Sequence, residues 1–423
     1  MENQKQFYGW RVLGVVWLVY FLNMGFGLYG GTVLNPAMMK DIPMDRATYG
    51  LGFTLLNFFI GFPSLLHAAS ISRWGIKGTF TIGSAFIILG SLWLSYVATE
   101  PWHYLLGFGV MIGMGVGFGS IIGLSTAVTR WFVRFRGRAM AIGFTAAGVA
   151  GFVVAPMMNS IIAADGATWR RGWLVVAVAA AVSALIAHFF VKERPEEFGQ
   201  LPDGGEAPGQ TVELKARLVT KFDWTLGDAV RSRVFWLIFA GSCATHFPFW
   251  MFTAHWIPVL KGLGYPPATY AFAMGLFVLG SLFGRLIGGW LMDWMSARYA
   301  FALGLCFYLV GSMMAINLTP DALNLAYLAG MSYGCAFGWA FVCLNTTTGN
   351  FFGVRSFARI NGVIMMASAA VCSPAAIVAG KMFDVYRSYV PAFELNMVLA
   401  VLGICALLFA RMPQLRRPEL AGA

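Results

Sequence analysis

Residues 191–233 read VKERPEEFGQLPDGGEAPGQTVELKARLVTKFDWTLGDAVRSR, and they form the one long hydrophilic segment of the chain. The segment is rich in charge, proline and glycine, whereas the sequence on both sides consists of apolar runs of 20 or more residues. A helical run of that length matches the hydrocarbon thickness of a bilayer. We therefore interpret 191–233 as a linker that divides a membrane-embedded chain into two halves.

The composition excludes an ordinary soluble protein. Hydrophobic residues make up 59% of the 423 residues and charged residues 11%, whereas soluble domains average about 45–50% and about 25%. Too few polar side chains are present to coat two or three globular domains. The N-terminal apolar run is too long for a signal peptide and lacks a small-residue cleavage site, so we expect it to remain as the first helix.

Windows of about 20 apolar residues predict twelve transmembrane helices, six on each side of the linker. Their expected ranges are roughly 10–37, 47–69, 78–98, 103–129, 138–163, 172–190, 234–260, 267–292, 299–317, 322–346, 358–381 and 390–411. We expect an all-α membrane protein with an N-terminal six-helix bundle at 1–190, a cytoplasmic linker at 191–233 and a C-terminal six-helix bundle at 234–423.

The distribution of positive charge predicts the orientation of the chain. Of 29 lysines and arginines, 21 fall on the side of the termini and the linker, seven fall opposite, and Arg285 lies within a helix. Cytoplasmic loops accumulate lysine and arginine, so both termini and the linker are predicted to be cytoplasmic. The net charge of +11 then reflects topology and not nucleic-acid binding.

The two halves repeat one pattern. A phenylalanine at the end of one helix is followed by arginines and then by a proline, 24 residues on from Phe132 to Pro156 and 22 residues on from Phe352 to Pro374. Halves that repeat in the same orientation are an architecture that places the substrate near the membrane midplane, between the repeats.

Two loops resemble motifs of the major facilitator superfamily. Gly289-Trp290-Leu291-Met292-Asp293, followed by Arg298, is similar to the GxLxD…R motif of that superfamily, and Arg73-Trp74-Gly75-Ile76-Lys77 is similar to its first-half counterpart. Ser72 stands where the first copy usually has aspartate, so this copy is expected to latch the inward-closed state less firmly. The resemblance implies a gating role for six residues: Arg73, Gly75, Lys77, Gly289, Asp293 and Arg298.

Three further segments resemble bacterial members of the monocarboxylate transporter family and the related oxalate/formate antiporter family. They are Phe7-Tyr8-Gly9-Trp10-Arg11, Ala254-His255-Trp256-Ile257-Pro258 with Leu263-Gly264-Tyr265 beyond it, and Gly284-Arg285-Leu286-Ile287-Gly288. The resemblance covers the whole chain. It implies secondary transport of small monocarboxylates such as lactate, pyruvate or acetate across a bacterial inner membrane, with organic anion exchange or metabolite export as the alternatives.

Arg285 is the leading candidate for the substrate site. It is expected in the middle third of the eighth helix, and no lysine, aspartate or glutamate lies at comparable depth. A charge there costs from about 2.5 to more than 10 kcal/mol, depending on the scale, unless it faces a polar cavity. Guanidinium matches a carboxylate with two parallel hydrogen bonds. A structural ion pair is the alternative, but the sequence offers no buried carboxylate for one.

Two histidines share the seventh helix, and they are expected on roughly opposite sides. The family pattern selects His255, whose imidazole is able to donate to a carboxylate or exchange a proton; a hydrogen-bonded packing role is the alternative. For His246 we favour packing. Other candidates for substrate contacts are Tyr333, Asn345, Ser120, Phe118, Leu28 and Tyr29.

The resemblance also shows departures that bear on coupling. Animal members of the family carry a lysine on the first helix and an aspartate one turn before the arginine of the eighth. Here Leu28 or the adjacent Tyr29 and Ser281 stand at those places, and Lys381 falls at the outer end of its helix, not in the middle as in the oxalate exchangers. We expect a proton to enter either on the substrate carboxylate beside Arg285 or on His255.

Other classes of function fit less well. No HExxH or P-loop motif occurs, and the glycines at 113–119 in the predicted fourth helix do not follow a strand, so an enzyme is not expected. A membrane sensor would need a soluble module larger than the linker.

The six cysteines show no CxxC pair, which argues against zinc or disulfides. We expect a monomer that binds a small monocarboxylate and a proton, with no cofactor, metal or nucleic acid.

Overall fold

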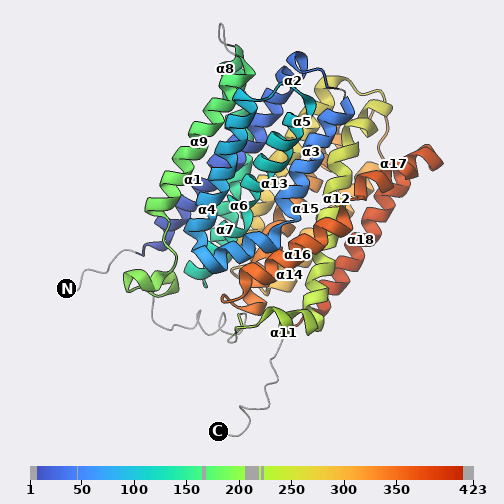
Figure 1. The fold of residues 1–423 in the computed structure, drawn as a ribbon. Coiled ribbons are helices and arrows are strands. Elements are labelled where there is room, and N and C mark those ends of the chain that lie inside the picture. The colour runs from blue at the N-terminus through green and yellow to red at the C-terminus, as the bar shows by residue number, and fades with distance from the viewer. Residues whose placement is uncertain (1–6, 45, 164–167, 205–218, 221–222, 413–423) are drawn as a thin grey trace. The chain divides into compact units, whose positions relative to one another are not determined.

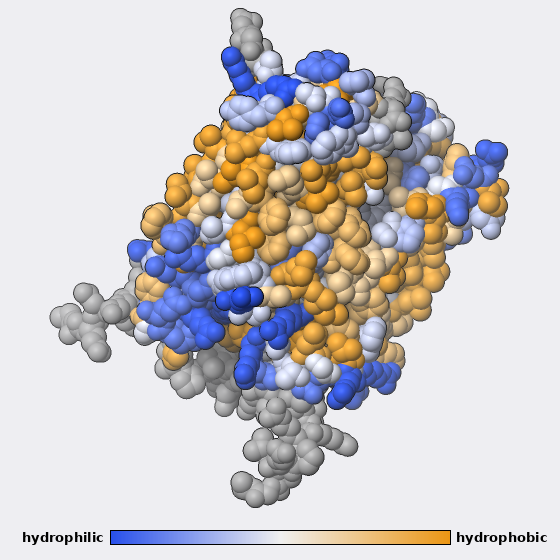
Figure 2. Space-filling view, viewed as in Figure 1, coloured by the Kyte–Doolittle hydropathy of each residue, from blue (hydrophilic) through white to orange (hydrophobic). Residues whose placement is uncertain are grey.

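The computed structural model describes residues 7–44, 46–163, 168–204, 219–220 and 223–412. The described residues form helices and no strand, which confirms the all-α fold class. Eleven of their helical stretches are long and apolar enough to cross a membrane, and the shorter apolar helix over Thr48–Gly61 supplies the remaining predicted span. Figure 2 shows hydrophobic side chains along the visible helices and hydrophilic ones gathered toward their ends.

The chain divides into two compact units. Unit 1 comprises Met1–Val133, Ala139–Glu206 and Asn361–Ala370, and unit 2 comprises Arg134–Arg138, Ala207–Ile360 and Val371–Ala423. Each unit consists mainly of one half of the sequence. Within the predicted linker, residues 205–218 and 221–222 lie outside the described part.

The first three spans of unit 1 contain specific interruptions (Figure 1). α1, Gly9–Met24, continues through the π-helical η1, Gly25–Gly30, into α2, Gly31–Asp41. α3, Arg46–Gly61, ends just before Pro63, because proline lacks the N–H that would continue the helix. α4, Ser64–Tyr96, then completes the second span and forms the third, with a break at Gly75, where φ is 73°. The second span therefore runs to residue 74, beyond the predicted end at 69.

The fourth span was expected to be one helix, and the structure interrupts it. It consists of α5, Pro101–Tyr104, the π-helical η2, Leu105–Ile112, α6, Gly113–Phe118, and α7, Ile121–Trp131. Between α6 and α7, Ser120 has φ −138° and ψ −106°, which no helix allows.

The remaining spans of unit 1 are longer helices. α8, Arg136–Ala163, forms the fifth span, and α9, Trp169–Phe190, forms the sixth and packs on α1 and α4 (Figure 1). The linker begins with two short 3₁₀ turns, η3, Pro195–Phe198, and η4, Pro202–Gly204.

The second half of the chain begins with a short helix and continues with the last six spans; residues 361–370 of the eleventh span belong to unit 1. α11 is Leu226–Arg231, and the spans are α12, Arg233–Gly262, α13, Pro267–Leu291, α14, Ala297–Ile316, α15, Leu323–Phe352, α16, Phe357–Cys372, with α17, Ala375–Tyr386, and α18, Val390–Phe409. The Ser232 hydroxyl caps α12 by accepting from the N–H of Phe235 at 3.2 Å. The eleventh span is interrupted at Pro374 and reaches Tyr386, beyond its predicted end at 381.

Candidate functional site

Facing glycines join the eighth and tenth spans within unit 2. Glycines repeat every four residues on both helices, and a side chain on any of them would overlap the facing helix: Gly280, Gly284 and Gly288 on α13, and Gly330, Gly334 and Gly338 on α15. Small residues at this spacing let membrane helices approach until their backbones touch. The glycine contact therefore fixes the rotation of α13 about its own axis.

This fixed rotation decides where Arg285 lies. At about 100° per residue, Arg285 falls on a flank of α13, between the glycine face and the exposed apolar face that includes Phe283, Leu286 and Ile287. The arginine is half-buried. It lies six residues before the helix ends at Leu291, which is about 9 Å along the axis. Arg285 is therefore in the last third of the helix and not in the predicted middle third.

One turn beyond Arg285, α13 meets the 134–138 segment. The backbones of Gly137 and Gly289 are in close contact. The N–H of Gly137 donates to Oδ1 of Asp293 at 3.2 Å, and Nε of Arg138 lies 3.1 Å from Oδ2. Asp293, the motif aspartate, is 7% exposed; it accepts a hydrogen bond from a backbone N–H and forms an ion pair with Arg138. This pairing stabilises a carboxylate that would otherwise be costly to bury.

Both ring nitrogens of His255 have hydrogen-bond partners. Nδ1 lies 3.1 Å from the hydroxyl of Tyr389, and Nε2 lies 2.8 Å from the carbonyl oxygen of Ala376. A carbonyl only accepts, so Nε2 carries the proton and Nδ1 accepts from tyrosine. Burial, with a smaller contribution from Asp384, raises the pKa of Tyr389 and keeps its hydroxyl a donor. His255 thus joins α12 to α17 and to the turn before α18.

A pocket of about 860 Å³ lies beside this histidine in unit 2. Its walls are mostly apolar, with Lys261 and Arg387 as cations and Tyr389 as a shared boundary. None of the predicted substrate residues lines it. This pocket and the predicted site are therefore different places, and the pocket adds no support to Arg285.

Tyr333 and Asn345 lie in the interior of unit 2. The Tyr333 hydroxyl is 2.6 Å from that of Ser312 and accepts from Nδ2 of Asn396 at 3.0 Å. Its ring stacks on Phe252, with ring centroids 4.2 Å apart. Asn345 donates to the carbonyl of Phe341 at 2.9 Å. Both side chains are 0% exposed, so a substrate would have to displace existing packing to reach them.

In unit 1, buried polar side chains form hydrogen bonds around the break in the fourth span. Nδ2 of Asn23 donates to the carbonyl of Gly119 at 3.2 Å, and the hydroxyl of Ser84 donates to the amide oxygen of Asn23 at 3.1 Å. The hydroxyl of Ser120 donates back to the carbonyl of Val116. Asn23, Ser84 and Ser120 are fully buried. The sequence placed Ser120 on a continuous helix, so the interruption beside it was missed.

Phe118, the other candidate on the fourth span, packs against a histidine that sequence reasoning overlooked. Its ring meets His67 edge to face, with centroids 4.4 Å apart, and stacks on Phe86 at 6.1 Å. His67 is 1% exposed, and its Nε2 atom has no hydrogen-bond partner in the described part of the chain. The sequence signal that could have identified His67 is the presence of a histidine within a predicted apolar span.

The first-span candidates lie on the π-helical segment η1. Tyr29 is half-buried, and its ring lies over Gly151 of α8. Leu28 packs against the apolar core of unit 1. The two side chains are adjacent in sequence but contact different neighbours.

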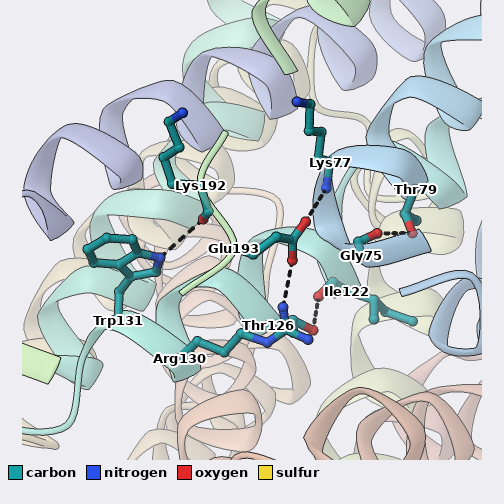
Figure 3. A network of polar contacts seen from close by, with 9 residues as sticks. All are labelled: Gly75, Lys77, Thr79, Ile122, Thr126, Arg130, Trp131, Lys192 and Glu193. Atoms are coloured by element: carbon teal, nitrogen blue, oxygen red, sulfur yellow. Dashed lines mark hydrogen bonds and ion pairs between the residues drawn. The ribbon is translucent and has the colours of Figure 1, made fainter. Parts of the chain in front are cut away.

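The first loop motif contacts a carboxylate that comes from outside the motif, that of Glu193 (Figure 3). Glu193, just after α9, accepts from the backbone N–H of Lys77 at 2.9 Å and pairs with Arg130 at 2.7 Å. Ser72, in the motif position, donates to the carbonyl of Ala69. Residues far apart in sequence supply this arrangement, so the loop pattern alone did not reveal it.

The other predicted gating residues make short-range contacts. The guanidinium of Arg73 lies over the ring of Trp74 at 5.1 Å. Gly75 adopts its positive φ directly against the carboxylate of Glu193. Arg298 donates to the hydroxyl of Tyr299 at 2.7 Å. These contacts locate the residues at the ends of the spans, and their role in gating stays a prediction.

Known proteins share this sequence pattern and fold. The family model of the Major Facilitator Superfamily matches residues 16–376. The oxalate:formate antiporter of Oxalobacter formigenes is 23% identical over 347 residues, covering 81% of this chain and 77% of that protein. Monocarboxylate transporter 13 of Bos taurus is 25% identical over 280 residues; the match covers 66% of this chain and 60% of that transporter's length.

A solved structure gives the same fold. The E. coli fucose:proton symporter FucP superposes with a TM-score of 0.66, covering 95% of this chain and 98% of that one. Its sequence is 13% identical, so the likeness concerns the fold alone.

Proposed function

Because the chain belongs to the major facilitator superfamily, we propose that it is a secondary active transporter of small monocarboxylates, of the size of lactate, pyruvate or acetate. The observation that carries the proposal is Arg285 on the flank of α13, half-buried and oriented by the glycine contact with α15. The names of two relatives, an oxalate:formate antiporter and a monocarboxylate transporter, agree with an anionic substrate.

The charge of Arg285 favours one carboxylate per transport event. Its planar fork forms two parallel hydrogen bonds to a carboxylate, and each bond to a charged group contributes about 1.5–3 kcal/mol. A dianion would call for a second cation. The sequence between Arg285 and Asp293 has no other charge, and the helix-11 lysine, Lys381, lies in the last third of its span, on α17.

The membrane potential calls for a compensating charge. Moving one anion inward against a negative-inside potential costs about 2.3 kcal/mol per 100 mV. A proton that enters with the carboxylate removes this cost, so we propose proton-coupled symport by alternating access. The proton rides on the substrate carboxylate or on a histidine; at His255 it would have to break the bond that Nδ1 accepts from Tyr389.

The same proposal covers topology. We assign both termini and the linker to the cytoplasmic side of a bacterial inner membrane, because 21 of the 29 lysines and arginines fall on that side. The two six-helix halves and the 191–233 linker act as the moving parts and their connection. We propose that one chain suffices for transport.

Anion exchange is the second candidate, favoured by the likeness to the oxalate:formate antiporter over 81% of the chain. An exchanger needs no proton, because one anion leaves as another enters. It would show rapid counterflow and no response to an inward proton gradient.

Uptake into proteoliposomes tests the proposal. Radiolabelled lactate or acetate is expected to accumulate with an inward proton gradient, and Arg285→Gln is expected to lower uptake about 100-fold, since both charged hydrogen bonds disappear. Arg171→Gln, the same change at an exposed position where α9 begins, serves as the control and should leave uptake unaltered. Full uptake by Arg285→Gln would refute the site, and a panel of monocarboxylates that all fail to enter would refute the substrate class.

A further inference from the structure

His67 lies where two interrupted helices of unit 1 meet. It is in the first turn of α4, and its backbone N–H bonds to the carbonyl of Pro63 at 3.1 Å. Its ring packs against Gly117 and Phe118, immediately before the break in the fourth span. A methyl group on Gly117 would come within 2.5 Å of Cε1 of the ring, so only glycine leaves room for the imidazole there.

The hydrogen bonding of this imidazole is incomplete. His67 is 1% exposed, and Nε2 has no partner among the described residues. The four other histidines of the chain are placed differently: His246 and His255 bond to backbone carbonyls, the Nδ1 of His103 accepts two backbone N–H groups, and His188 is exposed. A buried polar atom without a partner costs about 1–3 kcal/mol, so its presence calls for an explanation.

In the described part of the chain, few titratable residues lie on the elements that pack near His67. α6 and the 361–370 segment, which both pack near it, contain no titratable residue. On α3, Arg46 and Tyr49 lie near the start of the helix, more than three turns away in sequence. On α4, Arg73 and Lys77 lie toward the Gly75 break, at least six residues on. The ring is therefore free to respond to a charge that arrives with a ligand.

We propose that His67, beside the break in the fourth span, is the proton-binding residue of this transporter. This inference rests on the proposed function and names the residue that carries the proton. The neutral ring offers one nitrogen lone pair, which takes a proton from water and later returns it to water; nothing is oxidised or reduced.

Coupling follows from charge balance. A positive charge on a buried ring is costly when alone, and an incoming carboxylate lowers that cost. By linkage, the protonated ring lowers the cost of binding the carboxylate by the same amount. Proton and anion then enter together, and the loaded protein carries no additional net charge.

Because Nε2 of His67 has no hydrogen-bond partner among the described residues, we expect substitutions at this position to leave the protein folded. His67→Met replaces the ring by an apolar side chain, and removing an unpartnered polar atom is close to neutral or stabilising for the fold. We therefore expect His67→Met to keep or raise the melting temperature in detergent. His67→Gln, which keeps a polar side chain without a titrating group, serves as the second variant, and His188→Met, at an exposed position of α9, serves as the control.

The experiment measures gradient-driven uptake and counterflow of lactate in proteoliposomes. We expect both His67 variants to lose at least tenfold in gradient-driven uptake and far less in counterflow, whereas Arg285→Gln loses both. Equal losses in the two assays, or full proton-driven uptake by His67→Met, would overturn the proton role while leaving the proposed function standing. A wild-type protein that transports no monocarboxylate, or transports one without any response to protons, would overturn both.

Discussion

The fourth and tenth spans occupy corresponding places in the two halves of the sequence, and they differ in continuity. α15 runs without a break from Leu323 to Phe352, whereas the fourth span is divided into α5, η2, α6 and α7. The unbroken helix presents glycines to α13 and orients the flank that carries Arg285. In the broken span, the carbonyl of Gly119 accepts a hydrogen bond from Asn23. Phe118 packs against His67, whose Nε2 atom has no hydrogen-bond partner among the described residues.

This difference suggests a division of labour. A fixed cation benefits from a rigid support, because its position sets the geometry of two hydrogen bonds. A group that gains and loses a proton benefits from surroundings whose hydrogen bonding is incomplete, because both states are then accessible. We propose that unit 2 supplies anion recognition and that unit 1 supplies the response to protons.

The largest expected effect concerns the glycine contact. Gly334→Leu would force a side chain into the backbone of Phe277, and overpacking of this kind costs about 3 kcal/mol. We expect the melting temperature to fall by about 5 °C and transport to be lost. Gly275→Ala is the matched control, because Gly275 lies on α13 with open space around it. If the Gly334 variant is as stable as the wild type, α15 does not set the position of Arg285.

A smaller effect is expected at the break in the fourth span. Asn23→Leu removes the partners of the Gly119 carbonyl and the Ser84 hydroxyl, and leaving these groups buried costs about 2 kcal/mol. Thermal unfolding in detergent measures the loss. Asn57→Leu provides the comparison, since Asn57 is exposed and bonds only within its own helix. Equal stability of both variants would show that the break does not depend on Asn23.

The smallest effect is expected for Tyr333→Phe. The variant removes the hydroxyl that Ser312 and Asn396 contact, at a cost of about 1 kcal/mol. The structure favours a packing role, so the KM for lactate should change less than twofold while the melting temperature falls. A tenfold rise in KM at unaltered stability would instead support the ligand contact predicted from the sequence.

The sequence predicted the helices well, because a membrane span is decided by a local apolar run of sufficient length. Within the fourth span, Gly115 meets Gly83 of α4, a close approach of the kind that small residues allow in membrane helices. Local composition does not reveal the break at Ser120, since Gly, Phe and Ser in that run are equally compatible with a continuous membrane helix.

The candidate site was less predictable, because it depends on which way each side chain points. The inward direction of Tyr333 follows from its contacts with Ser312 and Asn396, which come from two other helices. Glu193 reaches Lys77 across 116 residues of sequence. The carboxylate at the first loop motif comes from a separate segment of the chain. The expectation based on Ser72 alone therefore described only part of the contacts at this motif.

The most direct test of the central claim is a binding measurement on the purified protein. Isothermal titration of lactate into wild-type protein and into Arg285→Gln isolates recognition from coupling and from the moving steps of transport. The account predicts saturable binding to the wild type, affinity about 100-fold weaker for the variant, and no binding of methyl lactate, which has no carboxylate. Equal affinity of the two proteins for lactate, or wild-type binding of the methyl ester, would contradict it.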